Sequence, residues 1–484
     1  MTREYFWLGI LFLLLVGMLT TGCQMPSQDG GAGTSSPADA PAEEAPSPEP
    51  VRVLFENVNI FDGISKQLRE QMSVLVEGNL IQSIARRIEN SPGATVIDGG
   101  GRTLMPGLID SHAHLNLTGL FQRIEDAQGA GWDEIGAMSA ANARDYLLDG
   151  YTTVRDACGM GTGLKKLVDR EILVGPRIYS SGACLSQTSG HGDMRMTSQR
   201  FPHAPPSSLE RLGIIEIADG AEEVLAASRR NLSHGAAFLK LMSGGGVSSE
   251  LDPLWTIQYT VEEIRAAVIA AEQVGTYVAC HAYHPAGIRN CLEAGGKSLE
   301  HAQLIDEPTM QLLVEKGVFL SLNTAGLAPI LFQHPNFASG PSRQKLEEMH
   351  EGARDLVRLV KEYEPKVVHN VDTVLSTFAQ GRARRDFEKY QFASLFGNMT
   401  LLRSMTSTGG ELAALTGKRN PYPGKLGVIE EGALADIIVV DGNPVEDIAV
   451  LGADPRWFDA RPRGEGIETI RLIMKDGKIY KNTL

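Results

Sequence analysis

The stretch Gly107-Leu108-Ile109-Asp110-Ser111-His112-Ala113-His114 is a short apolar run that ends in a His-X-His pair. A run of this length is typical of a buried β-strand. Side chains alternate between the two faces of a strand, so His112 and His114 point to the same side. Two imidazoles on one face are a candidate metal site, although a His-X-His pair on its own is more often coincidental than functional.

Further apolar runs follow this strand, and helical patterns separate most of them. The predicted strands are 107–114, 152–156, 177–181, 238–242, 278–282, 298–302, 319–323 and 366–372. The clearest helix runs from Thr260 to Gly275, where Thr260 and Glu263 form a capping box and Gly275 follows the last turn. Eight alternating units predict an α/β fold, a (β/α)8 TIM barrel over residues 107–422, with its longest insertion at 183–235.

A TIM barrel carries its chemistry at the C-terminal ends of its strands, so reactive side chains are expected there. Five of the eight predicted strands carry a metal-ligand type: His112 and His114, Lys240, His281, His301 and Asp372. Imidazole and carboxylate ligands suit a divalent transition metal such as Zn²⁺. A lone histidine in a strand is usually a hydrogen-bonded core residue, but chance rarely places so many at one end of a barrel.

Lys240 needs a separate explanation, because a protonated amine would repel a metal cation. Conversion by CO₂ to a carbamate would turn it into an anionic carboxylate that can bridge two metals. The competing interpretation is a Schiff-base lysine, as barrel lyases use. The surrounding histidines favour the carbamate.

Both ends of the folded chain are rich in β-structure. Residues 53–60 and 73–84 alternate apolar and polar side chains, and 434–440 and 469–475 also read as strands. We predict a small β-sandwich domain built from both ends of the chain, from residues 51–106 together with residues 423–484.

The N-terminal sequence predicts that the protein is exported from the cytoplasm. Residues 1–22 combine one arginine with an apolar run too short for a membrane span, as in a signal peptide. Cys23 follows in a lipobox-like context, and residues 24–50 contain few large apolar side chains, so we expect a lipidated Cys and disordered linker over 23–50. The predicted location is that of a bacterial lipoprotein, periplasmic or attached to the outer membrane. An ordinary signal peptide or an uncleaved anchor is the alternative.

The composition of the chain limits the classes of partner that it can bind. The formal net charge is −14, which argues against nucleic acid binding. We expect the protein to contact the membrane only through the lipid. The oligomeric state stays open, and a homo-oligomer is one of the alternatives. Five cysteines without a CxxC pair exclude a disulfide scaffold. Their spacing identifies no pair, and we expect Cys158, Cys184, Cys280 and Cys291 to be free, buried thiols.

The pattern of ligands resembles the binuclear centre of the amidohydrolase superfamily. The resemblance covers residues 51–484 and includes Met105-Pro106-Gly107-Leu108-Ile109-Asp110-Ser111-His112 and Gly427-Val428-Ile429-Glu430-Glu431-Gly432-Ala433-Leu434-Ala435-Asp436. Ser186-Gln187-Thr188-Ser189-Gly190-His191-Gly192-Asp193, His281-Ala282-Tyr283 and Glu300-His301-Ala302 are similar to one subgroup. That subgroup contains Xaa-Pro and Xaa-Arg dipeptidases, metallo-carboxypeptidases and ochratoxin-hydrolysing amidases. Asn370-Val371-Asp372 departs from the usual Gly-Thr-Asp, which leaves the ligand in place and changes the local loop.

The resemblance implies a ligand set and a mechanism. His112, His114 and Asp372 would hold one metal ion, His281 and His301 the other, and carboxylated Lys240 would bridge them. Such a centre lowers the pKa of a water and polarises an amide carbonyl. Asp372 would take the water proton as general base and pass it to the leaving amine as general acid.

The same resemblance assigns substrate contacts. His191, between two glycines, would act at the catalytic site and bind a C-terminal carboxylate, and Tyr283 would be a second substrate-binding residue. The alternative for His191 is a surface loop histidine. The run Gly244–Gly246 has no GKS/T after it, so it is interpreted as room for the metal site and not as a phosphate loop.

Three classes of function remain. The first is a metal-dependent amidohydrolase that releases a C-terminal amino acid from dipeptides or N-acyl amino acids, ochratoxin-type amides included. The second is a cyclic amide hydrolase of the imidazolonepropionase type, which an assay on ring substrates would identify. The third is a non-catalytic barrel that serves as a binding module, which metal analysis would test.

Overall fold

The computed structural model describes residues 50–484 apart from 90, 120–121, 123, 160, 202–203 and 250. The predicted signal peptide 1–22, Cys23 and all but the last residue of the predicted linker lie outside the described residues. Among the helices that are described, none is both long and apolar enough to cross a membrane.

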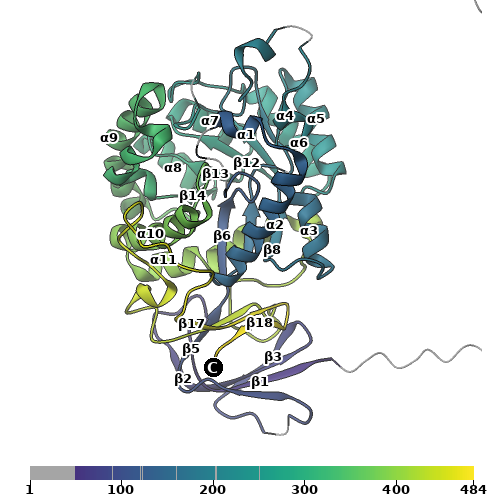
Figure 1. The fold of residues 1–484 in the computed structure, drawn as a ribbon, viewed down its shortest axis with the longest axis vertical. Helices are drawn as coiled ribbons and strands as arrows, with labels where there is room; N and C mark the ends of the chain where they lie inside the picture. The colour runs from purple at the N-terminus through teal and green to yellow at the C-terminus, as the bar shows by residue number, and fades with distance from the viewer. Residues whose placement is uncertain are drawn as a thin grey trace, which may run out of the picture. The chain divides into compact units, whose positions relative to one another are not determined.

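Eight parallel strands form the barrel predicted from the sequence (Figure 1). They are β6 (Leu108–Ala113), β7 (Tyr151–Asp156), β8 (Arg177–Ser180), β11 (Leu239–Met242), β12 (Val278–Ala282), β13 (Ser298–His301), β14 (Phe319–Leu322) and β15 (Val367–His369). Strands pair in register from β6 to β8 and from β11 to β15, for example Lys240 with Ala279 and His281 with Glu300. Between these two groups the Ala237 N–H donates to the Ser180 carbonyl at 2.7 Å. The last strand returns to the first, because the Asp372 N–H donates to the His112 carbonyl at 3.0 Å. The confirmed strand order brings all five ligand-bearing strands to one barrel mouth.

The segment 183–235, predicted as an insertion, contributes to the sheet itself. It contains β9 (Cys184–Ser186), η1 (Thr197–Gln199), α4 (Ser208–Arg211), β10 (Ile215–Ile217) and α5 (Ala221–Ser233). Leu185 of β9 pairs with Leu241 of β11, and both side chains are fully buried. The burial explains why this part of the insertion is ordered as a strand and not as a surface loop.

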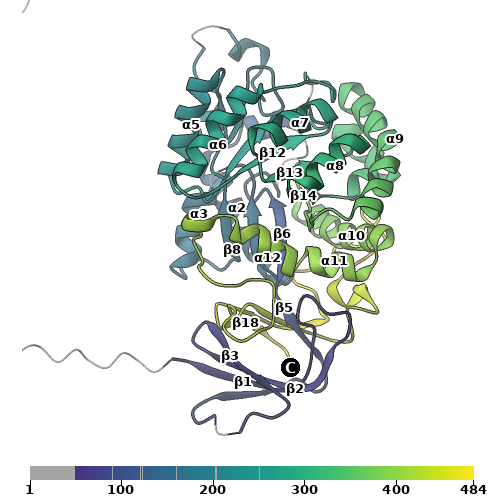
Figure 2. The same ribbon diagram turned by 180° about the vertical axis from the view of Figure 1, so that it is seen from behind.

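Helices surround the strands on the outside, as Figures 1 and 2 show. They are α1 (Ile124–Gln128), α2 (Trp132–Leu148), α3 (Gly161–Asp169), α6 (Val261–Gln273), α7 (Pro285–Ala294), α8 (Glu307–Glu315), α9 (Gly340–Tyr363), α10 (Phe378–Phe396), α11 (Asn398–Ser404) and α12 (Ser407–Ala414). The predicted capping box is present at α6, where Thr260 accepts from the Glu263 N–H and Glu263 bonds back to Thr260. The face of α6 that includes Ala267 and Ala271 packs in the same core as Leu241.

The two ends of the chain meet in one mixed sheet, which confirms the prediction that both ends contribute to it. Its strands are β1 (Arg52–Ile60), β2 (Arg69–Glu77), β3 (Leu80–Ala85), β4 (Thr95–Asp98), β5 (Thr103–Pro106), β16 (Ile437–Val440), β17 (Ile470–Lys475) and β18 (Lys478–Asn482). The purple and yellow strands of Figure 1 lie side by side because β5 and β16 pair antiparallel, Pro106 opposite Ile437. The pairing connects all eight strands into a single sheet. The exact domain boundaries at 106 and 422 stay predictions.

This mixed sheet is fixed to the end of the barrel where the strands begin. Arg177, the first residue of β8, forms ion pairs with Asp436 at 2.8 Å and with Asp476 at 2.7 Å. The Gly107 N–H, just before β6, donates to the Asp436 carbonyl at 2.9 Å. The C-terminal ends of the barrel strands are therefore left for the functional site.

The expectation of free thiols is wrong for all four described cysteines. Cys158 is bonded to Cys184, and Cys280 to Cys291. Cys280 points out of β12, as expected for a neighbour of His281, but it meets Cys291 of α7 there. The sequence hides these pairs because each joins two separate elements that come together only in the folded barrel.

Candidate metal site and substrate pocket

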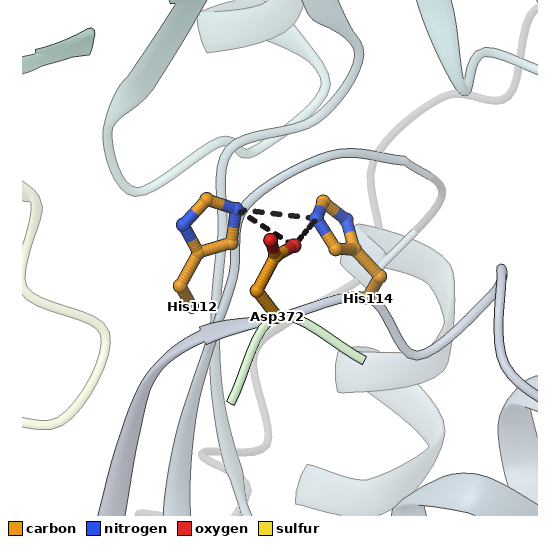
Figure 3. Close-up of side chains that lie close together, drawn as sticks. All are labelled: His112, His114 and Asp372. Atoms are coloured by element: carbon orange, nitrogen blue, oxygen red, sulfur yellow. Dashed lines mark hydrogen bonds and ion pairs between the residues drawn. The ribbon is translucent and has the colours of Figure 1, made fainter. Parts of the chain in front are cut away.

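His112, His114 and Asp372 converge at the barrel mouth (Figure 3). His112 lies in β6, His114 directly follows it, and Asp372 follows β15. The Nε2 atoms of the two histidines are 3.1 Å apart. Asp372 Oδ1 lies 3.2 Å from His114 Nε2 and 3.8 Å from His112 Nε2. Three ligand atoms so close together can hold one metal ion.

The other predicted ligands surround this group. Lys240 Nζ lies 3.3 Å from His112 Nε2. The His301 ring is 5.2 Å from the His112 ring and 4.5 Å from the His281 ring, measured between centroids. All six residues line one pocket. We call them the metal-site cluster: His112, His114, Lys240, His281, His301 and Asp372.

Left-handed backbone conformations shape this cluster. His301, Ala302 and Asp372 have φ values of 78°, 60° and 50°. Such conformations cost about 1–3 kcal/mol each in residues other than glycine and concentrate at functional sites. Strand alternation would send Glu300 and His301 to opposite faces, but the turn at His301 lets both side chains reach the cluster.

The unusual residues before Asp372 hold its loop by hydrogen bonds. Asn370 Nδ2 donates to Ser321 Oγ at 2.9 Å, and the Val371 N–H donates to Asp110 Oδ1 at 3.2 Å. Asn323 Nδ2 donates to Asp372 Oδ2 at 3.1 Å. The departure from Gly-Thr-Asp therefore leaves Asp372 beside His114.

Burial sets the protonation of the cluster. It lowers the pKa of His281 far below its ordinary value and that of His301 to about 4, so both imidazoles are neutral and able to act as ligands. Burial also lowers the pKa of Lys240 to about 8. For Asp372 burial alone would raise the pKa, but the hydrogen bond with His114 and the nearby imidazoles hold it well below its usual value.

Glu300 and Arg155 support the cluster and were not assigned roles from the sequence. Glu300 Oε2 lies 2.8 Å from His112 Nδ1 and accepts a hydrogen bond from its N–H, and this tautomer leaves Nε2 free to bind a metal. Arg155 forms a buried ion pair with the other Glu300 oxygen and donates to Ser298 Oγ at 3.1 Å. The position of Glu300 next to His301 was the one signal in the sequence that could have indicated its role. No pattern in the sequence indicated a role for Arg155.

His191 lies against the cluster. Its ring stacks on His281 with centroids 4.1 Å apart. Its Nδ1 contacts Ser249 Oγ at 2.8 Å and Asp252 Oδ2 at 3.2 Å, which leaves Nε2 as the ring nitrogen without a partner among the described residues. Burial would raise the pKa of Asp252, but the bond with His191 and nearby charges lower it to about 2. Asp252 is thus a fixed anion that orients the His191 ring.

The glycine run after Lys240 makes room for that ring. A Cβ atom on Gly246 would lie 2.1 Å from His191 Cε1, and one on Gly245 would lie 2.0 Å from the Pro253 carbonyl oxygen. The sequence predicted that these glycines leave space near the metal site. The structure shows that the His191 ring occupies the space beside Gly246.

Tyr283 completes the group of predicted substrate residues. Its ring stacks on His301 with centroids 5.1 Å apart, and it lines the same pocket. Asn323 and Arg384 also line the pocket and were missed in the sequence. A further wall of the pocket is apolar and comes largely from the segment after β14 and from α9: Val247, Leu331, Phe337, Leu346 and Met349.

The donor set fits a divalent metal centre. His301 Nδ1 is buried, lies 3.9 Å from Asp372 Oδ2 and has no hydrogen-bond partner among the described residues. Buried polar atoms are normally satisfied, so a ring nitrogen without a hydrogen bond beside a carboxylate indicates a place for a cation. Nitrogen and oxygen ligands of this kind suit Zn²⁺ and related metals.

Comparison with known proteins agrees with this geometry. The profile described as "Amidohydrolase family" matches residues 103–480. Ochratoxinase from Aspergillus niger is 30% identical over 385 residues, which cover 78% of this chain and 75% of the ochratoxinase. The chain belongs to the amidohydrolase family. It is a metal-dependent amidohydrolase that acts on C–N bonds, with a His-X-His and Asp metal site.

Solved structures place the chain near peptide-cleaving members. A prolidase complexed with N-methylphosphonate-L-proline is 30% identical with a TM-score of 0.77, and the match covers 90% of this chain and 100% of the prolidase. A Xaa-Pro dipeptidase with methionine bound in its active site is 26% identical with a TM-score of 0.73, covering 89% and 100%.

Proposed function

We propose that this amidohydrolase releases a C-terminal amino acid from dipeptides or N-acyl amino acids. The observation that carries the proposal is the placement of His191 and Tyr283 in the same pocket as the metal-site cluster. The N-methylphosphonate-L-proline and the methionine bound to the two related structures are an amino-acid derivative and an amino acid, and they support it. The apolar wall of the pocket favours an apolar group in the substrate.

We assign the two halves of the metal-site cluster to two divalent metal ions, most simply Zn²⁺. His112, His114 and Asp372 would hold one ion, His281 and His301 the other, and Lys240 would lie between them as a carbamate. When bound, the metals supply a polarised amide carbonyl and a water of lowered pKa. Asp372 accepts a proton from the water and delivers it to the leaving amine, and Asn323 keeps its carboxylate in place.

The carbamate forms when the neutral amine of Lys240 adds to the carbon of CO₂ and loses a proton. The lowered pKa of Lys240, about 8 because of burial, supports this step since it increases the share of neutral amine. Lys240→Ala is expected to lose bound metal and activity together, measured by elemental analysis and by turnover. Short carboxylic acids are expected to restore part of both. A variant that retains two metal ions and near-normal turnover would refute the bridging role.

The substrate assignment is tested with a panel of N-acyl amino acids and their C-terminal amides. Loss of a hydrogen bond to a charged group costs about 1.5–3 kcal/mol, which is about 10- to 150-fold in kcat/KM. His191→Ala is expected to lose that much on free-carboxylate substrates and far less on amides. Equal losses would mean that His191 does not contact the carboxylate, and hydrolysis of ring amides alone would favour a cyclic amide hydrolase.

We also propose that Cys23 carries a lipid and holds the barrel at the periplasmic or outer face of a bacterial membrane. The apolar segment, Cys23 and the linker composition support it. Labelled palmitate is expected in the wild type and not in Cys23→Ala. Equal labelling would refute the anchor.

A further inference from the structure

Arg384 is a buried arginine that faces the substrate pocket without an anionic partner. It lies on α10, lines the pocket and is 8% exposed. Its Nε donates to the Val371 carbonyl at 2.9 Å, and its guanidinium carbon lies 5.0 Å from the Trp457 ring centroid. It forms no ion pair with any described carboxylate. The charge of Arg384 does act on Glu388, four residues further along α10, but burial raises the pKa of that carboxyl to about 7.

Other buried arginines of the protein form ion pairs, which makes the lack of one at Arg384 unusual. Arg155 pairs with Glu300, Arg177 with Asp436, and the adjacent Arg385 with two aspartates. A buried cation without a counter-charge is costly, so natural proteins pair it. The chain has 59 acidic residues, so the missing partner does not reflect a shortage of carboxylates.

Tyr283 is a second pocket residue that carries a polar group. The Tyr283 hydroxyl has no hydrogen-bond partner among the described residues, and both side chains line the same pocket. The pocket of the metal-site cluster is therefore also lined by a guanidinium that has no ion-pair partner and a hydroxyl that has no hydrogen-bond partner among the described residues.

We propose that Arg384 binds a carboxylate group of the substrate, with the Tyr283 hydroxyl as a second donor. The planar guanidinium matches a carboxylate through paired N–H donors, and a partly desolvated site strengthens the pairing. The inference rests on the proposed release of a C-terminal amino acid and identifies a specificity-determining residue for it. The carboxylate could be the α-carboxylate of the released residue or an acidic side chain, and the experiment separates the two.

The test compares Arg384→Met and Arg384→Lys with the wild type on matched pairs of substrates. N-acetyl-L-methionine and its C-terminal amide report on the α-carboxylate. N-acetyl-L-glutamate and N-acetyl-L-glutamine report on a side-chain carboxylate. Arg382→Met is the matched control, because Arg382 is on the same helix and pairs with Asp145 at 2.7 Å; its preference within each pair should stay that of the wild type.

Arg384→Met is expected to lower kcat/KM by about 10- to 150-fold on the substrate that carries the recognised carboxylate and little on its neutral partner. Arg384→Lys should recover part of the preference because it keeps the charge. A loss confined to the methionine pair identifies the α-carboxylate, and a loss confined to glutamate identifies the side chain. Equal losses on charged and neutral members of both pairs would overturn the proposal and leave Arg384 as a structural support for Val371 and Trp457.

A binding measurement separates this inference from the proposed function. Calorimetric titration with L-methionine, L-methioninamide and L-glutamate does not need turnover. If the wild type hydrolyses none of the panel, the proposed function fails. Weaker binding of an amino acid by Arg384→Met, with amide binding unchanged, would still support the carboxylate site, and identical binding by both proteins would overturn it.

Discussion

Two of the buried clusters of charged or titratable side chains among the described residues differ in how completely they are paired. One is the metal-site cluster at the barrel mouth, where His114 Nδ1 and His301 Nδ1 lack hydrogen-bond partners among the described residues. The other, which we call the seam cluster, joins α2, α10 and the C-terminal segment: Asp145, Asp149, Arg385, Asp386 and Arg463.

Every member of the seam cluster has a counter-charge. Arg385 contacts Asp145 at 2.6 Å and Asp149 at 2.7 Å, and Arg463 contacts Asp149 at 2.8 Å and Asp386 at 2.6 Å. The cluster links the helix after the first barrel strand to the helix after the last. The difference teaches that this fold pairs its buried charges where they hold elements together, and leaves polar atoms without hydrogen bonds where a ligand can enter.

Asp372→Asn is expected to give the largest effect and should change function more than stability. The amide cannot accept a proton from water, so kcat should fall by about 10²–10⁴-fold. The thermal midpoint of the metal-free protein should stay close to that of the wild type. Turnover and metal content are measured together. A variant that keeps its metals and near-normal kcat would remove Asp372 from proton transfer.

Arg385→Met tests the other side of the comparison and should change stability more than function. It leaves Asp145 and Asp149 buried with too little positive charge, and breaking a buried pair in this way costs about 3–5 kcal/mol. Denaturant unfolding measures the loss, while KM and substrate preference of the folded fraction should be unchanged. Arg343→Met, which breaks an exposed pair with Glu347, is the control and should cost about 1 kcal/mol or less. Comparable losses in both variants would contradict the structural role of the seam cluster.

The sequence could predict the barrel and its ligand-bearing strands because both follow local rules. Apolar runs mark the strands, and parallel strands bring their C-terminal ends together, so His281 and His301 could be assigned to one site from the sequence alone. The position of Asp372 was also predicted, but not its left-handed backbone, φ 50°, which depends on the Val371 and His112 contacts.

What the sequence could not predict depends on long-range pairing. Arg155 meets Glu300 from 145 positions away. Arg384 and Arg385 are neighbours in sequence with the same charge, yet one is paired and the other faces the pocket. The disulfide between Cys280 and Cys291 likewise needs α7 packed on β12. These contacts have no local pattern, because they are fixed only when separate elements pack.

Glu388 gives the smallest expected change in stability of the variants considered. It is a buried carboxylate whose hydrogen-bond donors are neutral. It accepts hydrogen bonds from Thr324 Oγ1 at 2.7 Å and from the Ala325 N–H at 2.6 Å, and it supports the loop that carries Asn323. Burial raises its pKa from 4.5 to about 7, with only partial relief from the hydrogen bonds and the Arg384 charge.

Between pH 4.5 and about 7 the folded protein thus holds a proton on Glu388 that the unfolded chain has released, so stability falls as the pH rises through this window. One proton gives a slope on the order of 1 kcal/mol per pH unit. Asp110 and Asp156, whose pKa values burial raises to about 6, add slopes of the same sign. Glu388→Gln should therefore flatten part of the decline, seen as a smaller difference in unfolding free energy between pH 5 and pH 8. The exposed Glu411→Gln is the matched control and should leave the slope unchanged. If both variants keep the wild-type slope, Glu388 is ionised across the window, and some cation must then compensate its charge as the arginines of the seam cluster compensate theirs.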